Sequence, residues 1–142
     1  MLWWVVLALS LFSVPLQAQG IKDFPRVHGV SSVTIGAPFL YFNLEPVVPQ
    51  EKFRDWWQEM EQCAGVKKAF DEVAWYVADV IYSFAQNQGA WGIYYHTPPE
   101  IIIVRNRSEA RIENTAKHEI LHHLLRDNHD GVTFLRCVPK EN

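Results

Sequence analysis

The chain has 142 residues, which is enough for one domain and hardly enough for two. Its formal net charge of −3 and the lack of a basic patch argue against a nucleic-acid partner. Aromatic residues make up 13% of the sequence, which favours a packed globular domain over a disordered chain.

The N-terminal segment is typical of a secretory signal peptide. Residues 2–16 are mostly apolar and carry no charge, and the small residue Ala18 follows at a suitable cleavage position. We expect residues 1–18 to be removed, which leaves a secreted or periplasmic domain over residues 19–142. The alternative is a membrane anchor that is never cut, and we expect a membrane partner only in that case.

The chain contains two cysteines, Cys63 and Cys137. In an exported protein an even number of cysteines predicts a disulfide bond. The bond would close a loop of about 75 residues and stabilise the fold by roughly 4 kcal/mol in the chain-entropy model. Two free buried thiols are the better interpretation only if the chain is not exported.

The first half of the domain predicts one clear helix. Residues 39–42 fit a short strand, and a helix is predicted over residues 50–64. The apolar side chains of that helix recur on one face at positions Phe53, Trp56, Trp57, Met60 and Ala64. Gly65 then provides a C-terminal stop.

The middle of the chain favours strands. Residues 72–78 fit both a helical and an alternating pattern, and we favour a strand because β-branched and aromatic residues are abundant there. Residues 86–92 are predicted to be a loop. Residues 93–95 and 100–105 are predicted to be two strands around a turn at 97–99. The fold class is therefore α+β, with a small mixed or antiparallel sheet and two main helices.

The second main helix is predicted from Ser108, a suitable N-cap, to about Arg126. Its apolar stripe consists of Ile112, Ala116, Ile120 and Leu124. Residues 127–128, Asp-Asn, are expected to end it. This helix carries most of the histidines of the chain.

The histidine-rich segment reads His118-Glu119-Ile120-Leu121-His122. At about 100° per residue, His118 and His122 lie one turn apart on the same helical face and can both reach one Zn²⁺. Zinc lowers the pKa of a bound water, and Glu119 lies at the right angle to accept its proton as a general base. The segment therefore predicts a catalytic zinc site.

A third ligand must come from outside this motif, and His129 is our choice. It follows His122 by seven residues, just after the expected end of the helix. The alternatives, in falling order, are Asp130, Asp127, His96 and Glu141. Three protein ligands would leave a fourth position open, which distinguishes a catalytic zinc site from a structural one.

Two further sets of polar side chains lie near this site in the sequence. His123 points about 100° away from His122, so we expect it to be partly exposed or to support the ligands from behind. Tyr94, Tyr95 and His96 are candidates for a donor to an oxyanion, although an ordinary role in a sheet is favoured for each.

The motif resembles that of the zincin metallopeptidases. The resemblance implies that His118 and His122 hold zinc and that Glu119 is the general base. It also implies that the helix packs under a small sheet whose edge strand binds an extended peptide, and residues 100–105 are the candidate strand. It covers about residues 100–137 and rests on the motif alone.

Comparison with the zincin branches gives a partial fit. The ending His129-Asp130 is similar to the adamalysin form of the metzincin pattern HExxHxxGxxH. The chain has one extra residue before the last His, Leu125 where Gly is expected, and no downstream Met. A Glu ligand from a later helix, as in gluzincins, also fits poorly, because only 20 residues follow His122. We therefore expect a small, divergent zincin.

The sequence thus predicts an exported, monomeric zinc hydrolase, a metallopeptidase that acts on a peptide or protein substrate. Two alternatives remain open: an exported zinc-binding module without catalysis, and a zinc amidase that acts on a non-protein substrate. A structural protein with incidental histidines is the third interpretation, and it predicts no metal.

Overall fold

The computed structural model describes residues 32–36, 38–126, 129 and 131–140. The predicted signal peptide, residues 1–18, lies outside this part of the chain. Within it, no helix combines the length and apolar character that crossing a bilayer requires. Cys63 and Cys137 form the predicted disulfide bond.

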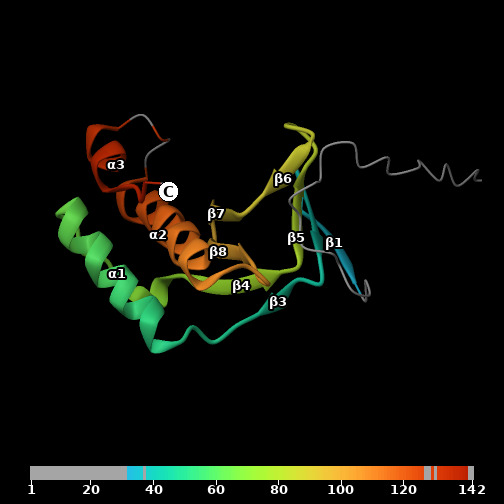
Figure 1. Ribbon diagram of the computed structural model, residues 1–142, viewed down its shortest axis with the longest axis horizontal. Helices are drawn as coiled ribbons and strands as arrows, with labels where there is room; N and C mark the ends of the chain where they lie inside the picture. The colour runs from blue at the N-terminus through green and yellow to red at the C-terminus, as the bar shows by residue number, and fades with distance from the viewer. Residues whose placement is uncertain (1–31, 37, 127–128, 130, 141–142) are drawn as a thin grey trace, which may run out of the picture.

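The architecture is α+β, as predicted, with helices on one side of two small sheets (Figure 1). One sheet has the strand order β1-β2-β5-β6 and is antiparallel. The other has the order β3-β4-β8-β7 and is mixed, because β4 and β8 run parallel. The strands are β1 (Val33–Gly36), β2 (Phe39–Phe42), β3 (Glu45–Pro46), β4 (Ala74–Ala78), β5 (Val80–Ser83), β6 (Gln88–Ala90), β7 (Gly92–His96) and β8 (Pro99–Val104).

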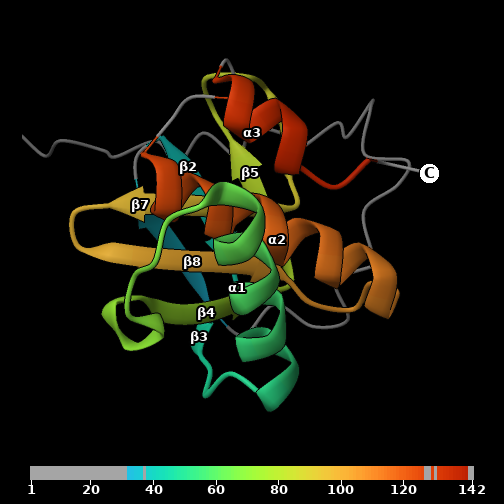
Figure 2. The ribbon, with the colours of Figure 1, turned by 90° about the vertical axis from the view of Figure 1, so that its left-hand side faces the viewer.

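Helices α1 (Glu51–Ala64) and α2 (Glu109–Leu125) cover the outer face of the mixed sheet, and α3 (Val132–Cys137) packs against α1 and α2 (Figure 2). A buried cluster joins α1, α2 and α3 to β4 and β8, and it includes Trp57, Trp75, Ile101, Ile120 and Phe134. Its members on α1 and α2 belong mainly to the apolar stripes predicted for these two helices. Burial of these stripes is the main force that holds α2 against the sheet.

A second buried cluster lies between the two sheets and includes Tyr41, Ile81, Ile93, Ile102 and Val104. Successive residues of β8 alternate between the two clusters, because side chains in a strand point to opposite faces. Both faces of the mixed sheet are therefore covered, which explains why residues 101–103 are Ile-Ile-Ile rather than an alternating pattern.

Most predicted elements match the structure. The helix predicted over 50–64 is α1, and Gly65 ends it in the left-handed conformation with φ of 70°. The predicted strand at 72–78 is β4, preceded by a short 3₁₀ turn at Phe70–Glu72. The two strands around the turn at 97–99 are β7 and β8, which pair antiparallel.

One predicted element was wrong, and one helix was not predicted. The segment 86–92 is not all loop, because β6 (Gln88–Ala90) pairs with β5 and Gly92 begins β7. A glycine- and glutamine-rich sequence became a strand because its backbone completes a sheet edge, which local propensity does not register. The helix that was not predicted is α3, which has six residues and is held by the disulfide bond.

Candidate metal centre and the adjoining cavity

Helix α2 positions most of the site. Its N-terminus is capped by Ser108, whose side chain accepts a hydrogen bond from the Arg111 backbone N–H at 3.4 Å. The helix packs against α1, α3, β7 and β8, so side chains that differ by about 100° around its axis meet different surroundings. Two of these surroundings hold the polar residues of the motif.

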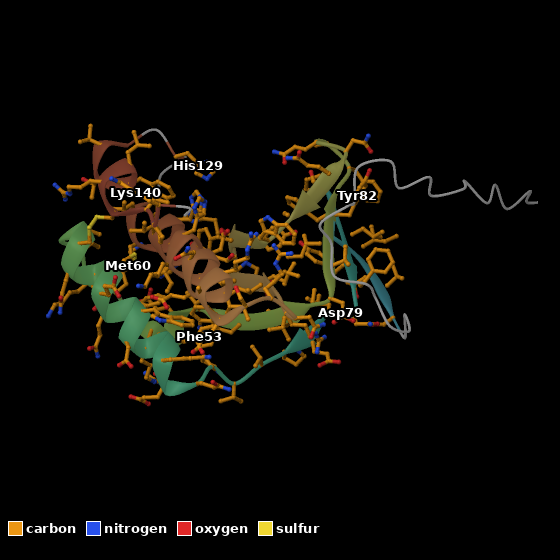
Figure 3. All side chains as sticks on the ribbon, viewed as in Figure 1. Phe53, Met60, Asp79, Tyr82, His129 and Lys140 are labelled. Atoms are coloured by element: carbon orange, nitrogen blue, oxygen red, sulfur yellow. A yellow bond between two sulfur atoms is a disulfide. The ribbon has the colours of Figure 1, made fainter. Side chains whose placement is uncertain are left out.

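The first polar face of α2 brings together the three predicted zinc ligands. The Nε2 atoms of His118 and His129 are 2.9 Å apart, those of His122 and His129 are 3.1 Å apart, and those of His118 and His122 are 3.3 Å apart. Among the described residues, these three are the group of side chains close enough to share one metal ion. The side chain of His129 lies over α2, next to the ribbon of α3 (Figure 3).

Three imidazoles in this arrangement fit a metal ion better than a hydrogen-bonded cluster. Three neutral rings that meet through the same nitrogen cannot satisfy each other with hydrogen bonds around a closed triangle. Nitrogen ligands at about 2.0–2.1 Å from a tetrahedral zinc lie about 3.3 Å from one another. The observed separations of 2.9–3.3 Å are close to that value.

Two described residues after the last turn of α2, Arg126 and His129, have positive φ. Arg126, the C-cap of α2, has φ of 52° and ends the helix in the left-handed conformation. His129 itself has φ of 43°. Positive φ is uncommon outside glycine, and such positions concentrate at functional sites. Arg126 and His129 therefore both adopt conformations that the surrounding structure must stabilise.

Phe134 of α3 forms the floor of the histidine cluster. Its ring centroid lies 4.8 Å from that of His122 and 5.3 Å from those of His118 and His129. Phe134 is only 1% exposed. The sequence alone does not identify Phe134 as part of the site, because nothing in the order of residues shows that α3 packs against the motif.

The electrostatics of His118 suit a metal ligand. Burial, together with the neighbouring His122 and His129, lowers the pKa of His118 to about 4. The ring is therefore neutral at pH 7 and keeps a lone pair for coordination.

The second polar face of α2 points to β7 and carries Glu119. Glu119 is 6% exposed, and burial raises the pKa of its carboxyl to about 8. A Cβ at position 92 would lie only 2.9 Å from Glu119 Oε1 and 2.5 Å from Thr115 Cγ2. Gly92 thus allows the β7 backbone to lie directly against the carboxyl group, a close approach that a larger residue would block.

His123 lies one turn after Glu119 on the same face. It is 2% exposed, so the expectation of a partly exposed ring was wrong. Its Nδ1 is 3.0 Å from the Tyr94 hydroxyl, and its Nε2 is 3.4 Å from a carboxylate oxygen of Glu72. The Tyr94 hydroxyl is also 3.3 Å from His96 Nδ1. His123 and Tyr94 therefore connect α2 to β7.

The strand expected to lie at the sheet edge does not. Residues 100–105 correspond mainly to β8, which pairs with β4 on one side and with β7 on the other. The edge strand next to α2 is β7 (Gly92–His96). The continuous hydrophobic run in β8 is typical of a central strand, because such a strand is covered on both faces.

A cavity of about 300 Å³ adjoins the motif. His118 and Glu119 line one part of it, and Gly92 and Trp91 come from the start of β7 and the residue before it. Arg107 and Arg111 also line the cavity, and the Arg107 guanidinium lies 3.6 Å from the centre of the Trp91 ring. The histidine cluster is thus next to a space that can admit a small group.

The alternative third ligands fall into two classes. Asp127, Asp130 and Glu141 lie outside the described residues. His96 lies within them but is not part of the three-histidine group. Its ring contacts Tyr94 instead, with ring centroids 6.2 Å apart. The structure therefore places His129, and not His96, beside His118 and His122.

Comparison with known proteins gives no identification. No family model matches the chain. No curated protein and no solved structure matches it either. The function must therefore be argued from the geometry of the site.

Proposed function

We propose that the protein is an exported zinc-dependent hydrolase of the zincin type, most simply a metallopeptidase. The convergence of three imidazole nitrogens at His118, His122 and His129 is the observation that carries this proposal. A buried carboxyl group, Glu119, lies beside them on the next face of the same helix. When bound at these nitrogens, zinc polarises a substrate carbonyl and acidifies water.

In this proposal Glu119 holds and moves the proton. Its buried position allows it to take a proton during attack on the carbonyl and to return it to the leaving amine. Without a metal the carboxyl is largely protonated at pH 7, because burial raises its pKa to about 8. A nearby cation favours the carboxylate, so metal binding and the basic form of Glu119 support each other.

The edge strand β7 is the proposed guide for the substrate. Its outer edge offers backbone groups that can pair with an extended peptide, and Gly92 places this edge against Glu119. A peptide aligned along β7 would bring one of its amide bonds to the histidine cluster. The proposed strand for binding an extended peptide is therefore β7 and not residues 100–105.

Zinc content and hydrolysis together test the proposal. We expect about one zinc per chain of the purified protein, on the stoichiometry of a single three-histidine site. His118→Ala and His129→Ala should each lose the metal. Glu119→Gln should keep the metal and lose hydrolysis of a peptide library by a factor of about 100 or more, since general acid–base catalysis contributes that much.

Three results would change the conclusion. Absence of metal from the reconstituted wild type would remove the hydrolase and leave a structural protein. Full hydrolysis by zinc-loaded Glu119→Gln would remove the assigned base. Zinc binding without hydrolysis of peptides or of other amides would leave a binding module, although the buried Glu119 has no use in pure binding.

A further inference from the structure

We propose that the protein binds a lipid bilayer through the outer face of the antiparallel sheet β1-β2-β5-β6, with the histidine cluster on the side of the molecule away from the lipid. The proposal goes beyond the hydrolase function and does not depend on it. The sequence predicts a membrane partner only for an uncut N-terminal anchor, whereas the folded domain itself makes this contact.

The pairing register shows which side chains of this sheet point outward. Tyr41 of β2 and Ile81 of β5 are paired, and both belong to the cluster between the two sheets. Successive residues in a strand point to opposite faces, so the residues on either side of these two point away from that cluster. The outward set is Val33, Ile35, Leu40, Phe42, Val80 and Tyr82.

The outward set is apolar apart from one tyrosine hydroxyl, and part of it is strongly exposed. Ile35 is 74% exposed and Val33 is 50% exposed. Phe84, which follows β5, is 55% exposed, and its ring centroid lies 5.7 Å from that of Tyr82. Figure 1 shows α1, α2 and α3 at the other end of the molecule and no described helix or strand on the outer side of this sheet. An antiparallel sheet with one face in water normally carries polar side chains on that face.

The sheet also lacks charge. None of the residues in β1, β2, β5 and β6 is Asp, Glu, Lys, Arg or His. The mixed sheet differs, because it contains Glu45, His96 and Glu100. Moving a charged side chain out of water is costly, and an uncharged apolar face can leave water without that cost. Contiguous exposed apolar surface of this kind marks a contact with a protein or a membrane.

The size of the face favours lipid over a second protein chain. Four strands about 4.8 Å apart and about 14 Å long give a face of roughly 300 Å² in projection. A stable protein dimer covers about 800 Å² on each partner, which is well above this value. Lipid needs no matching partner surface, and the strength of a peripheral contact grows with the apolar area that it buries. The face is therefore too small for a stable dimer but suits a peripheral membrane contact.

The route of the chain brings its apolar N-terminal stretch to the same sheet. Residues 2–16 are mostly apolar, and Ser32 directly precedes β1. Residues 17–31 join the two and can span at most about 50 Å, at about 3.3–3.6 Å per residue. A retained N-terminal anchor would therefore hold this sheet, rather than the helices, next to the bilayer.

This contact orients the candidate metal centre. His129 lies beside the helices, whereas Tyr82 lies on the antiparallel sheet at the other side of the molecule (Figure 3). A bilayer against the outer face of this sheet leaves the histidine cluster on the aqueous side. The site then meets substrates in the water beside the membrane and not groups inside it.

An environment-sensitive label tests the contact directly. The fluorophore NBD is attached to Ile35→Cys in the full chain, under conditions that keep the native disulfide bond, and phosphatidylcholine vesicles are added. Val132→Cys is the matched control, because Val132 is apolar and 81% exposed but lies on α3. We expect emission at position 35 to rise about twofold or more as the label leaves water, and emission at position 132 to stay unchanged. Because each label reports its own surroundings, a retained N-terminal anchor does not confuse the result.

A charge placed on the face should remove the contact. With the label at Phe84→Cys, we expect the response to vesicles to be lost when Ile35→Lys is added, since a charged side chain resists burial in lipid. Val132→Lys should leave the response intact. The zinc content of Ile35→Lys should equal that of the wild type, which separates loss of lipid contact from damage to the metal site.

Several results would overturn the proposal. Labels on the sheet that do not respond to vesicles would remove the lipid contact, even if the chain itself is bound to the vesicles. An apolar environment at position 35 before lipid is added would mean that protein covers the face, the same chain at monomer mass or a second copy at twice that mass. A response that needs anionic lipid and disappears in 1 M salt would assign membrane binding to basic groups elsewhere. None of these results bears on zinc binding or hydrolysis, so the proposed function stands or falls separately.

Discussion

The two polar faces of α2 contain the same kinds of residue in different surroundings. The cluster face holds His118 and His122 beside His129, over the ring of Phe134. The sheet face holds Glu119 and His123 against β7, where His123 contacts Tyr94. His122 and His123 are neighbours in the sequence, yet only His122 meets other imidazole nitrogens.

This difference shows that helical direction decides the role of a histidine. A rotation of about 100° between consecutive residues turns His122 toward α3 and His123 toward the sheet. On the cluster face, imidazole nitrogens lie close enough together to bind one metal ion. On the sheet face, the ring of His123 is buried and its contact with Tyr94 connects α2 to β7, whereas Glu119 lines the cavity.

The largest expected effect distinguishes His122→Ala from His123→Ala. Zinc sites in small peptides are worth about 10–16 kcal/mol, so one ligand in four accounts for roughly 4 kcal/mol, or about a thousandfold in affinity. We expect His122→Ala to weaken zinc binding on that scale and His123→Ala to change it little. Competition with a chromophoric chelator measures both. Equal losses in the two variants would erase the distinction between the faces.

The next effect concerns the buried carboxyl of the sheet face. The pKa of Glu119 is about 8 in the folded, metal-free protein and about 4.5 as an ordinary carboxyl. Between these pH values the folded state binds the proton and the unfolded state does not, so the free energy of unfolding falls as pH rises. At pH 7 the accumulated loss is about 3 kcal/mol.

Glu119→Gln removes this loss. The metal-free variant should therefore be more stable than the metal-free wild type by about 3 kcal/mol at pH 7, and the difference should vanish near pH 4.5. Urea unfolding across this pH range, with a chelator present, measures it. A difference that does not depend on pH would show that Glu119 is not buried as a neutral acid.

The disulfide bond is expected to support the cluster face from a distance. Replacement of Cys63 and Cys137 by serine should lower the free energy of unfolding by about 2–4 kcal/mol. It should also weaken zinc binding, because Cys137 anchors α3, whose Phe134 lies under the three imidazoles. Unfolding curves and zinc competition on the same variant test both. Unchanged zinc affinity in a destabilised variant would separate α3 from the site.

The smallest effect belongs to the contact between Tyr94 and His123. Tyr94→Phe removes the hydroxyl that lies 3.0 Å from His123 Nδ1 and leaves the ring in place. We expect a loss of about 1 kcal/mol in stability, typical of one hydrogen bond, and no change in zinc affinity. Tyr82→Phe, on the other sheet, is a control for removal of a tyrosine hydroxyl. A large drop in zinc affinity would assign Tyr94 to the cluster face.

Local patterns predicted most of the elements correctly. The apolar spacing of 50–64 and of 108–126 corresponds to α1 and α2, and Gly65 and Ser108 occupy the expected caps. The strand pair around 97–99 was also predicted correctly. These features depend on neighbours within a few residues, and periodicity is sensitive to that range. The segment 86–92 failed because its strand depends on pairing with β5.

The candidate site also has a part that local sequence determines and a part that depends on the fold. The spacing of His118, Glu119 and His122 depends only on helical geometry, so the sequence alone determined that two imidazoles share a face and that the carboxyl lies on the next one. The return of His129 to this face was a prediction based on distance along the chain. The structure brings its Nε2 within 3.1 Å of that of His122.

Tertiary structure alone decided the surroundings of these residues. Three features of the site depend on segments that are distant in sequence. They are the contact between Phe134 and the imidazoles, the placement of Gly92 against Glu119, and the burial of His123. The edge position of β7 likewise depends on the order of four strands. Local sequence determines which way a side chain leaves its own element, whereas long-range packing determines what it meets there.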